Sequence, residues 1–459
     1  MLEAGFDGKP VVVEVGPAVV VGDHTVVRIV MSNPGDEHYY VSSEFGTTRA
    51  PLSLFDVRMF SLDKGLVFPE LNTSNDGLGR QVTKDDPVDL FPVFAAVDGD
   101  IKTVELLLPS LGMVTGVPVV GESQAGYSAA EVVAKAEFVA SDPGPFKLQS
   151  HTMAADGSSD TKQDEKSTTV TVAGDVTFAV DSDQLSAQAD GVLAGVVEQI
   201  RKYPSGGDLT ITGHTDDVAD DVHNQDLSER RAKAVAERLK TLTDLSTWKQ
   251  SVSGKGESAP RVPNDSDERR QANRRVEINL KPSKPEEGDS GKGNSAVPSS
   301  TEAPSPAGPV GKGPEGVNVT VDGKTLRMSI DRVIRIGKYL AGAVALSSEQ
   351  EVPMQASAFA LPSSMQGLGE WIIGGVYSLT LLDGSTRYME AGYEFPDKGQ
   401  QPAAMTSLAS SVQPGVPMHL PVVWPDTGGD SVTIDIPGGE ARGPGRVVAR
   451  LTDIPVVNG

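Results

Sequence analysis

The alternation of apolar and polar positions divides the chain into stretches of different kinds. Between residues 11 and 120, short runs rich in β-branched side chains alternate with turn residues, as in VVVEV at 11–15 and TVELLLP at 103–109. Residues 317–459 have the same pattern. Such runs predict strands, and their spacing is typical of antiparallel β-sandwiches. We therefore expect an immunoglobulin-like (Ig-like) β-sandwich at each end of the chain.

The middle of the chain has a different pattern. Apolar residues recur every three or four positions in residues 185–203 and again in 227–242, as on the buried face of a helix. Asp226 and Glu229 resemble a capping pair at the start of the second helix. Strand-like runs begin at 168 and occupy 208–215, 248–256 and 275–280. We expect an α+β domain in which helices pack on a sheet.

Two polar stretches separate these units. Residues 151–167 are polar enough for a connector, and residues 282–316 hold almost no large apolar side chain, so they cannot offset the entropy cost of ordering. The predicted fold class is a multidomain protein, an α+β central domain flanked by two β-sandwiches. The predicted boundaries are a sandwich at 1–125, a connector at 126–167, the central domain at 168–282, a disordered linker at 283–316 and a second sandwich at 317–459.

The two flanking units also resemble each other. Residues 91–109 and 420–437 both combine a Pro-Val strand, a Gly-Asp turn, an alternating strand and a closing proline. Residues 116–120 are echoed by 453–457, and 24–33 by 331–342. We predict that the second sandwich repeats the first. Similar composition in two unrelated sandwiches is the alternative.

Composition narrows the possible partners. Lys and Arg total 40 against 63 Asp and Glu, a formal charge of -23, which would repel nucleic acid over long range. The absence of cysteine excludes disulfides, thiolate zinc sites and a cysteine nucleophile. No apolar run reaches the length of about 18 residues that a membrane helix needs. We therefore expect no nucleic-acid partner and no membrane span in this chain.

Specific chemistry is concentrated around Asp216 and Arg231. Asp216 follows a predicted strand, while Asn224, Ser228 and Arg231 share one face of a predicted helix. A carboxylate binds an ammonium and a guanidinium grips a carboxylate, so together the two charges suit a free amino-acid end. A structural ion pair between them fits the same spacing, and at this point both alternatives remain open.

Four blocks in this region occur in order: GHTD at 213–216, NQDLSERRAKAVAERL at 224–239, GKGESAP at 254–260 and NRRVE at 273–277. With these blocks, residues 168–282 resemble the peptidoglycan-binding OmpA-like domain family. The resemblance implies noncovalent binding of the diaminopimelate stem of peptidoglycan. By position, it implies that Asp216 and Arg231 grip the ligand. The supporting residues would be Thr215, Asn224 and one arginine of Arg274 and Arg275.

Two positions depart from the family pattern, which usually has glycine where this chain has Ala219 and Arg269. Alanine resists a positive φ, so Ala219 is expected to stiffen the loop that follows Asp216. Neither change removes a group that would touch the ligand.

The resemblance also implies a cell-envelope protein outside the cytoplasm, either secreted or lipid-anchored, with a leader that this chain does not contain. We expect no enzymatic activity, no cofactor and no metal, because no nucleophile pattern or metal-ligand spacing is present. One alternative is an envelope scaffold whose sandwiches bind a protein partner, with little wall binding. Others are a wall hydrolase with paired carboxylates, and a flagellar stator, which needs an N-terminal membrane helix.

Overall fold

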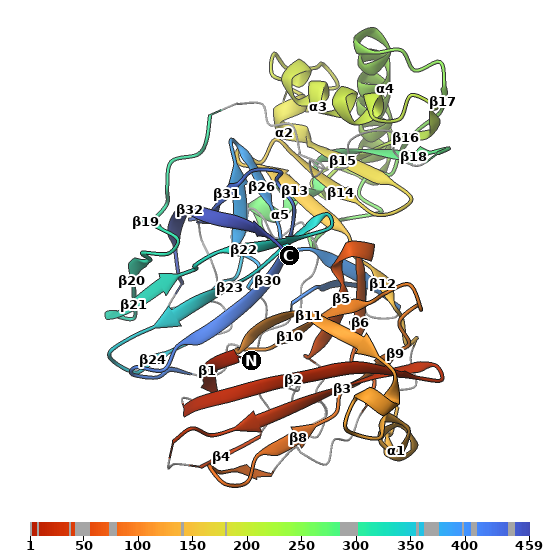
Figure 1. Ribbon diagram of the computed structural model, residues 1–459. Helices are drawn as coiled ribbons and strands as arrows, with labels where there is room; N and C mark the ends of the chain where they lie inside the picture. The colour runs from red at the N-terminus through yellow and green to blue at the C-terminus, as the bar shows by residue number, and fades with distance from the viewer. Residues whose placement is uncertain are drawn as a thin grey trace.

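The computed structural model describes residues 2–6 (backbone only), 9–35, 38–41, 56–72, 80–138, 142–179, 181–284, 302–354, 358–361, 376–396, 399–404, 411–438 and 446–459. Three parts follow one another in space (Figure 1): an N-terminal β unit at the bottom, a C-terminal β unit in the middle and an α+β domain at the top. The central part of the sequence therefore lies at one end of the molecule.

The N-terminal unit is built from short strands. Its elements are β1 (Leu2–Phe6), β2 (Lys9–Val21), β3 (His24–Ser32), β4 (Tyr39–Tyr40), β5 (Arg58–Ser61), β6 (Leu66–Pro69), β7 (Gln81–Val82), β8 (Val88–Leu90), β9 (Val93–Ala95), β10 (Thr103–Leu108), β11 (Gly112–Val120), α1 (Ala129–Lys135) and β12 (Phe146–Lys147). The first part of β11 pairs with β10, and Val119–Val120 pair in parallel with β2. The alternating apolar residues of these strands form one core, which includes Val13, Ile29, Met59 and Leu106.

The C-terminal unit comprises β19 (Val310–Lys312), β20 (Val317–Val321), β21 (Lys324–Ser329), β22 (Val333–Ile336), β23 (Tyr339–Ser347), β24 (Val352–Pro353), β25 (Thr380–Asp383), β26 (Thr386–Tyr388), β27 (Gly392–Phe395), β28 (Gly399–Pro402), β29 (Ser411–Val412), β30 (Met418–Pro425), β31 (Ser431–Ile436) and β32 (Ala449–Asn458). Trp424 is fully buried in its core, and its indole nitrogen donates to the carbonyl of Leu379 at 2.7 Å.

The two β units share a strand order. The N-terminal order β6-β5-β10-β11-β2-β3-β9 corresponds, with the same parallel and antiparallel pairings, to β26-β25-β31-β32-β22-β23-β30. A register shift occurs at matching places, between Val104 and Leu106 and between Val432 and Ile434. One predicted correspondence is wrong, because residues 333–336 form β22, the counterpart of β2, whereas 24–33 contain β3. The strand of the C-terminal unit that corresponds to β3 is instead β23, the next strand along the chain after β22.

The β units are packed against each other through a shared apolar cluster. It combines Phe60 and Leu107 of the first unit with Tyr339, Tyr393 and other residues of the second. The amide of His419 also donates to the carbonyl of Ser110 at 3.0 Å. Burial of this cluster joins the two units into one body, although they are far apart in sequence.

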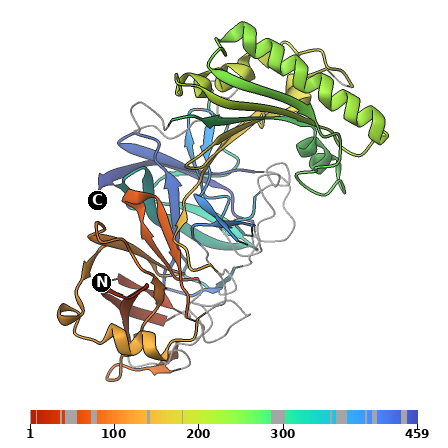
Figure 2. The same cartoon turned by 90° about the vertical axis from the view of Figure 1, so that its right-hand side faces the viewer.

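The α+β domain contains β15 (Thr168–Ala173), α2 (Gly174–Thr177), α3 (Ala189–Arg201), β16 (Gly207–His214), α4 (Asp221–Leu242), β17 (Trp248–Gly254), α5 (Asp267–Asn273) and β18 (Arg275–Pro282). Its strand order is β17-β16-β18-β15, with β16 and β17 parallel. Helices α3 and α4 pack on this sheet (Figure 2) through a core that includes Leu193, Val196, Val235 and Leu239. The predicted α+β arrangement is confirmed.

The predicted connector is partly wrong. Residues 150–163 form a hairpin of β13 (Ser150–Ala154) and β14 (Ser159–Gln163), in which β14 pairs with β15 and β13 pairs with β26. One sheet therefore runs from the α+β domain into the C-terminal unit. The polar sequence did not predict this hairpin, because one of its buried residues is the charged Asp160. Asp160 is paired with Arg261 at 2.7 Å.

The C-terminal end of the predicted linker also belongs to the fold. Residues 285–301 lie outside the described part of the chain, but β19 pairs in parallel with β32. A Cβ on Gly311 would lie 2.4 Å from the carbonyl oxygen of Gly316, so glycine is needed for this close approach. Low apolar content hid a strand held by backbone hydrogen bonds.

Candidate functional site

The site lies where β16 ends beside the first turns of α4. Asp220 caps this helix, and its side chain accepts from the amide of His223 at 3.0 Å. The predicted helix start at Asp226 and Glu229 is therefore wrong. Asp226 instead lies on the exposed face, where Arg230 donates to it at 2.8 Å. Capping six residues earlier places Asn224, Ser228 and Arg231 together on the buried face, which confirms the predicted helical face.

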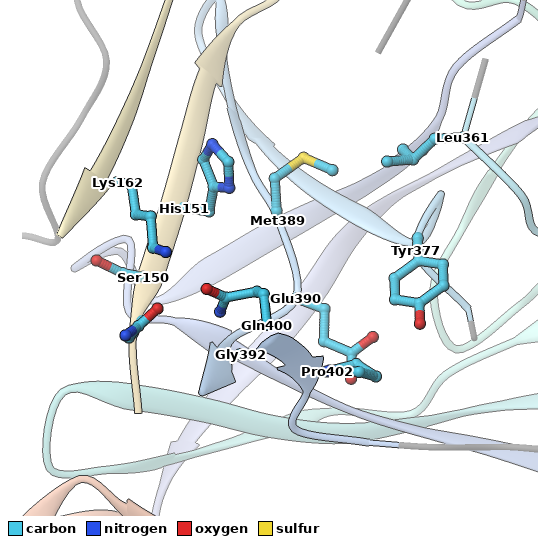
Figure 3. A pocket seen from close by; sticks show the side chains of 11 residues that line it. Ser150, His151, Lys162, Leu361, Tyr377, Met389, Glu390, Gly392, Gln400 and Pro402 are labelled. Carbon is cyan, nitrogen blue, oxygen red and sulfur yellow. The ribbon is translucent and has the colours of Figure 1, made fainter. Parts of the chain in front are cut away.

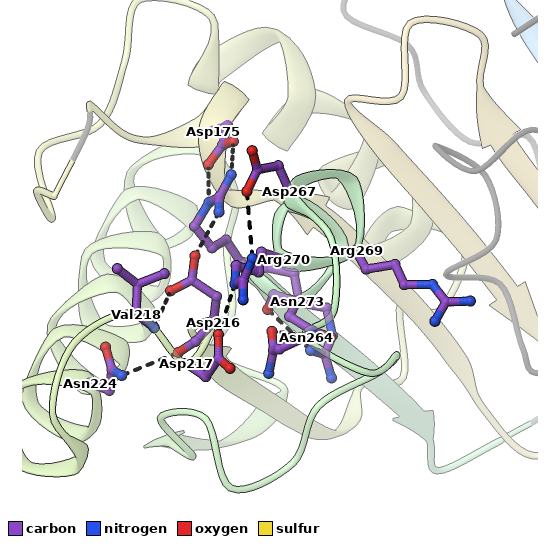
Figure 4. A network of polar contacts seen from close by, with 12 residues as sticks. Asp175, Asp216, Asp217, Val218, Asn224, Asn264, Asp267, Arg269, Arg270 and Asn273 are labelled. Atoms are coloured by element: carbon purple, nitrogen blue, oxygen red, sulfur yellow. Dashed lines mark hydrogen bonds and ion pairs between the residues drawn. The ribbon is translucent and has the colours of Figure 1, made fainter. Parts of the chain in front are cut away.

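Asp216 follows directly on β16 and is largely buried. One carboxylate oxygen accepts from Nη1 of Arg274 at 2.6 Å, and the other accepts from the amide of Val218 at 3.3 Å. Arg274 also makes a two-pronged contact with Asp175, at 2.7 and 2.6 Å. The carboxylate of Asp216 is thus held in place by Arg274, which lies between α5 and β18. Figure 4 shows Asp216 and Asp175, the two carboxylates that this arginine connects.

Arg231 lies in the same region but is bound differently. Its Nε donates to the carbonyl of Ser182 at 2.9 Å, and its guanidinium lies 5.2 Å from the ring centre of Phe178. Among the described residues it forms no ion pair, and its two terminal nitrogens have no hydrogen-bond acceptor. Burial lowers the pKa of Arg231, an effect that Asp175, Asp181 and Asp216 oppose at longer range. The structural ion pair between Asp216 and Arg231 is therefore absent.

Asn224 organises the loop between these two charges. Its Nδ2 donates to the carbonyls of Asp216 and Ala219, at 3.2 and 3.1 Å, and to Glu257 at 2.5 Å. Ala219 does not have a positive φ, so the alanine fits this loop without strain. Asn224 therefore holds the backbone of the loop that carries Asp216.

Residues 177–274, which carry all of these contacts except those of Asp175, match the OmpA family. They form an OmpA family domain.

Curated relatives match over the same region. Outer membrane porin F of Pseudomonas aeruginosa is 36% identical over 106 residues, covering 23% of this chain and 30% of the porin. Outer membrane protein A of Escherichia fergusonii is 32% identical over 121 residues, covering 24% of this chain and 49% of that protein. The chain spans less than half the length of each of these two relatives.

A solved structure, the cell wall anchor of the T6SS from Pseudomonas aeruginosa, is 29% identical with a TM-score of 0.25. It covers 27% of this chain and 88% of its own.

The remaining predicted residues of the OmpA domain fall in different places. Arg274 contacts Asp216, whereas the side chain of Arg275 bonds Glu277 at 2.8 Å and the carbonyls of Asn273 and Ala259. Arg275 therefore does not join the contact network of Asp216. Thr215 is buried, its amide donates to the carbonyl of Gly256 at 3.0 Å, and its hydroxyl has no partner among the described residues.

Several residues beside the site were missed by the sequence analysis. Asp175 holds Arg274, Phe178 lies under Arg231, and the Ser182 carbonyl accepts from it. All three precede α3 in the chain, and no motif marks them. A carbonyl acceptor in particular leaves no trace in the side-chain sequence.

Other ligand types have little support here. Within the described residues, no group of three or more His, Cys, Asp or Glu side chains could hold a metal ion. Asp217, from the acidic run after β16, is bound by Arg270 at 2.9 Å. Over the same part of the chain, no helix is long and apolar enough to cross a membrane.

Proposed function

We propose that the OmpA domain binds peptidoglycan noncovalently, with Asp216 and Arg231 holding the free amino-acid end of a diaminopimelate stem. The observation that carries this proposal is the buried Arg231, whose terminal nitrogens have no acceptor in the described structure. A buried guanidinium without a carboxylate is unfavourable, and a ligand carboxylate would supply two parallel hydrogen bonds. Asp216, positioned by Arg274, would accept the ligand ammonium.

The OmpA family match supports peptidoglycan as the ligand class. On this proposal the protein acts in the cell envelope as a binding protein without catalytic activity, secreted or lipid-anchored. Thr215 and Asn224 would support the site from the loop, as would Arg274. Arg275 would not touch the ligand and would instead stabilise the domain through its bonds to Glu277, Asn273 and Ala259.

Titration calorimetry with a diaminopimelate-containing stem peptide tests this. We expect Asp216→Ala and Arg231→Ala each to weaken binding by more than about tenfold, since a charge-assisted hydrogen bond contributes about 1.5 to 3 kcal/mol. Arg238→Ala is the matched control. Arg238 lies on the same helix, is bound to Asp190 at 2.5 Å and should be neutral for binding.

Equal binding by wild type, Asp216→Ala and Arg231→Ala would contradict the assigned residues. Co-sedimentation with insoluble cell wall tests the broader function. Wild-type protein that stays in the supernatant would favour the alternative, a scaffold whose β units bind an envelope protein.

For the β units, we propose two copies of one Ig-like β-sandwich. Their shared strand order, pairing directions and register shift support a duplication. Generic sandwich composition does not require a shift at matching places.

A further inference from the structure

A pocket lies between the β13–β14 hairpin and the C-terminal unit (Figure 3), and none of the residues that form the OmpA site lines it. Gln149, His151 and Lys162 line it from the hairpin side, and Tyr377, Glu390 and Gln400 line it from the C-terminal unit. None of these residues belongs to the OmpA family match. The pocket therefore needs its own explanation.

Glu390 is the most unusual residue in the pocket. It follows β26 and is 7% exposed. One carboxyl oxygen accepts from the amide of Ala404 at 2.6 Å, whereas the other is buried without a hydrogen-bond partner among the described residues. An unpartnered carboxyl oxygen in such a place is costly. It marks a position where a donor is missing.

Two other oxygens in the lining also lack a donor among the described residues, although Lys162 adds an ammonium group to the wall. The side-chain oxygens of Gln149 and Gln400 are also buried without a partner in the described structure. Tyr377 and Met389 add an aromatic ring and a polarizable sulfur to the wall. Acceptors together with an aromatic side chain suit a small positively charged group.

We propose that this pocket binds the primary ammonium group of a ligand, with Glu390 as its counter-ion and the Gln149 and Gln400 oxygens as further acceptors. Three oxygens in the lining of one pocket lack a donor in the described part of the chain, and a primary ammonium has three protons to donate. The proposal is independent of peptidoglycan binding.

Ligand binding in this pocket should depend on pH. Burial raises the pKa of Glu390 well above its usual value, whereas a bound ammonium would favour the carboxylate. Where Glu390 carries a proton, the carboxyl would lose it to solvent when the ammonium enters, and the ion pair would replace the O–H bond. The other titratable lining groups are His151, bonded to Asp160 at 3.3 Å, Lys162, which lies 3.9 Å from Glu394, and Tyr377, whose pKa burial raises further.

Titration calorimetry of the full chain with methylammonium chloride tests the proposal. Binding should be saturable at neutral pH, and it should weaken as the pH is lowered, because protonation of Glu390 removes the counter-ion. Nα-acetyl-lysine amide distinguishes a lysine side chain from a free small amine as the source of the ammonium. Sodium chloride and tetramethylammonium chloride control for ionic strength and size, and neither should compete.

Glu390→Gln keeps the size of the side chain and removes the charge, so affinity for methylammonium should fall about tenfold or more. Gln400→Leu should weaken binding severalfold and remains informative if the first variant does not fold. Glu198→Gln, which removes an exposed carboxylate in α3, should leave this binding unchanged. Unchanged affinity in Glu390→Gln would overturn the proposal, and if that variant does not fold, unchanged affinity in Gln400→Leu would do so. Binding of sodium as tight as that of methylammonium would also overturn it, as would wild-type affinity that does not fall at lower pH.

Discussion

Arg231 combines two properties that usually exclude each other: it is buried, and it forms no ion pair within the described structure. Replacing such a group with an apolar side chain of similar length is often neutral or stabilising. We expect Arg231→Met to raise the free energy of unfolding by about 1 kcal/mol in urea denaturation, while abolishing stem-peptide binding. A loss of more than about 2 kcal/mol would instead make the Ser182 and Phe178 contacts structural.

A second prediction for a single residue concerns Glu105 in β10 and the pH dependence of stability. Burial raises its pKa to about 7, although the amide of Leu62 donates to it at 3.0 Å and opposes the shift. The unfolded chain ionises this carboxyl near 4.5, so its effect on stability is most favourable below that pH and is lost as the pH rises to about 7.

The expected loss of unfolding free energy from Glu105 is at most about 3 kcal/mol between these two pH values. Glu105→Gln keeps an acceptor for Leu62 and should flatten this part of the pH profile. Urea denaturation at pH 5 and pH 8 measures it. If the free energy of unfolding changed by the same amount between pH 5 and pH 8 in wild type and variant, Glu105 would not titrate in this range.

At the scale of elements, the contact between α4 and the sheet depends on glycine. A Cβ on Gly213, in β16, would lie 2.1 Å from the carbonyl oxygen of Ser228. Gly213→Ala must therefore push α4 away from the sheet and move Arg231 relative to Asp216. We expect a loss of about 2 kcal/mol or more in thermal or urea unfolding, together with weaker binding. Gly191→Ala, in α3 with open space around its Cβ, is the matched control and should not destabilise.

Helices and strands could be predicted from the sequence where buried apolar residues recur at regular spacing. The helices and strands of the OmpA domain follow from their apolar spacing, and Asp216 and Arg231 fall in one region because a strand end and a helix face meet there. The β13–β14 hairpin was missed because its buried residues include Asp160, whose partner Arg261 comes from another part of the chain. Phe178 and Ser182 were missed for the same reason, since their roles exist only in the folded domain.

At the scale of the whole molecule, the OmpA domain is joined to the hairpin by buried charge as well as by strand pairing. Arg261, in the OmpA domain, contacts Asp160 of β14 at 2.7 and 3.2 Å, and this contact lowers the pKa of Asp160 despite its burial. Arg261→Ala would leave that carboxylate buried with His151 alone.

Hydrogen exchange should show the consequence of losing Arg261. We expect faster exchange in β13 and β14 and a global loss of about 3 kcal/mol, as when one partner of a buried pair is removed. Exchange in β16 should change less. Uniform change across the OmpA domain would contradict a role at the junction. Arg201→Ala, which removes an exposed pair with Glu198, is the matched control.

The sheet that continues from β15 through the hairpin into β26 also defines a mechanical path. If the OmpA domain holds the cell wall, tension from the wall reaches the β units through backbone hydrogen bonds across these strands. Along this path β14–β15 joins five residue pairs, β13–β26 and β26–β25 join three each, and β25–β31 joins two. A pulling force that followed the described strands would therefore meet its weakest pairing inside the C-terminal unit, between β25 and β31, rather than at the hairpin.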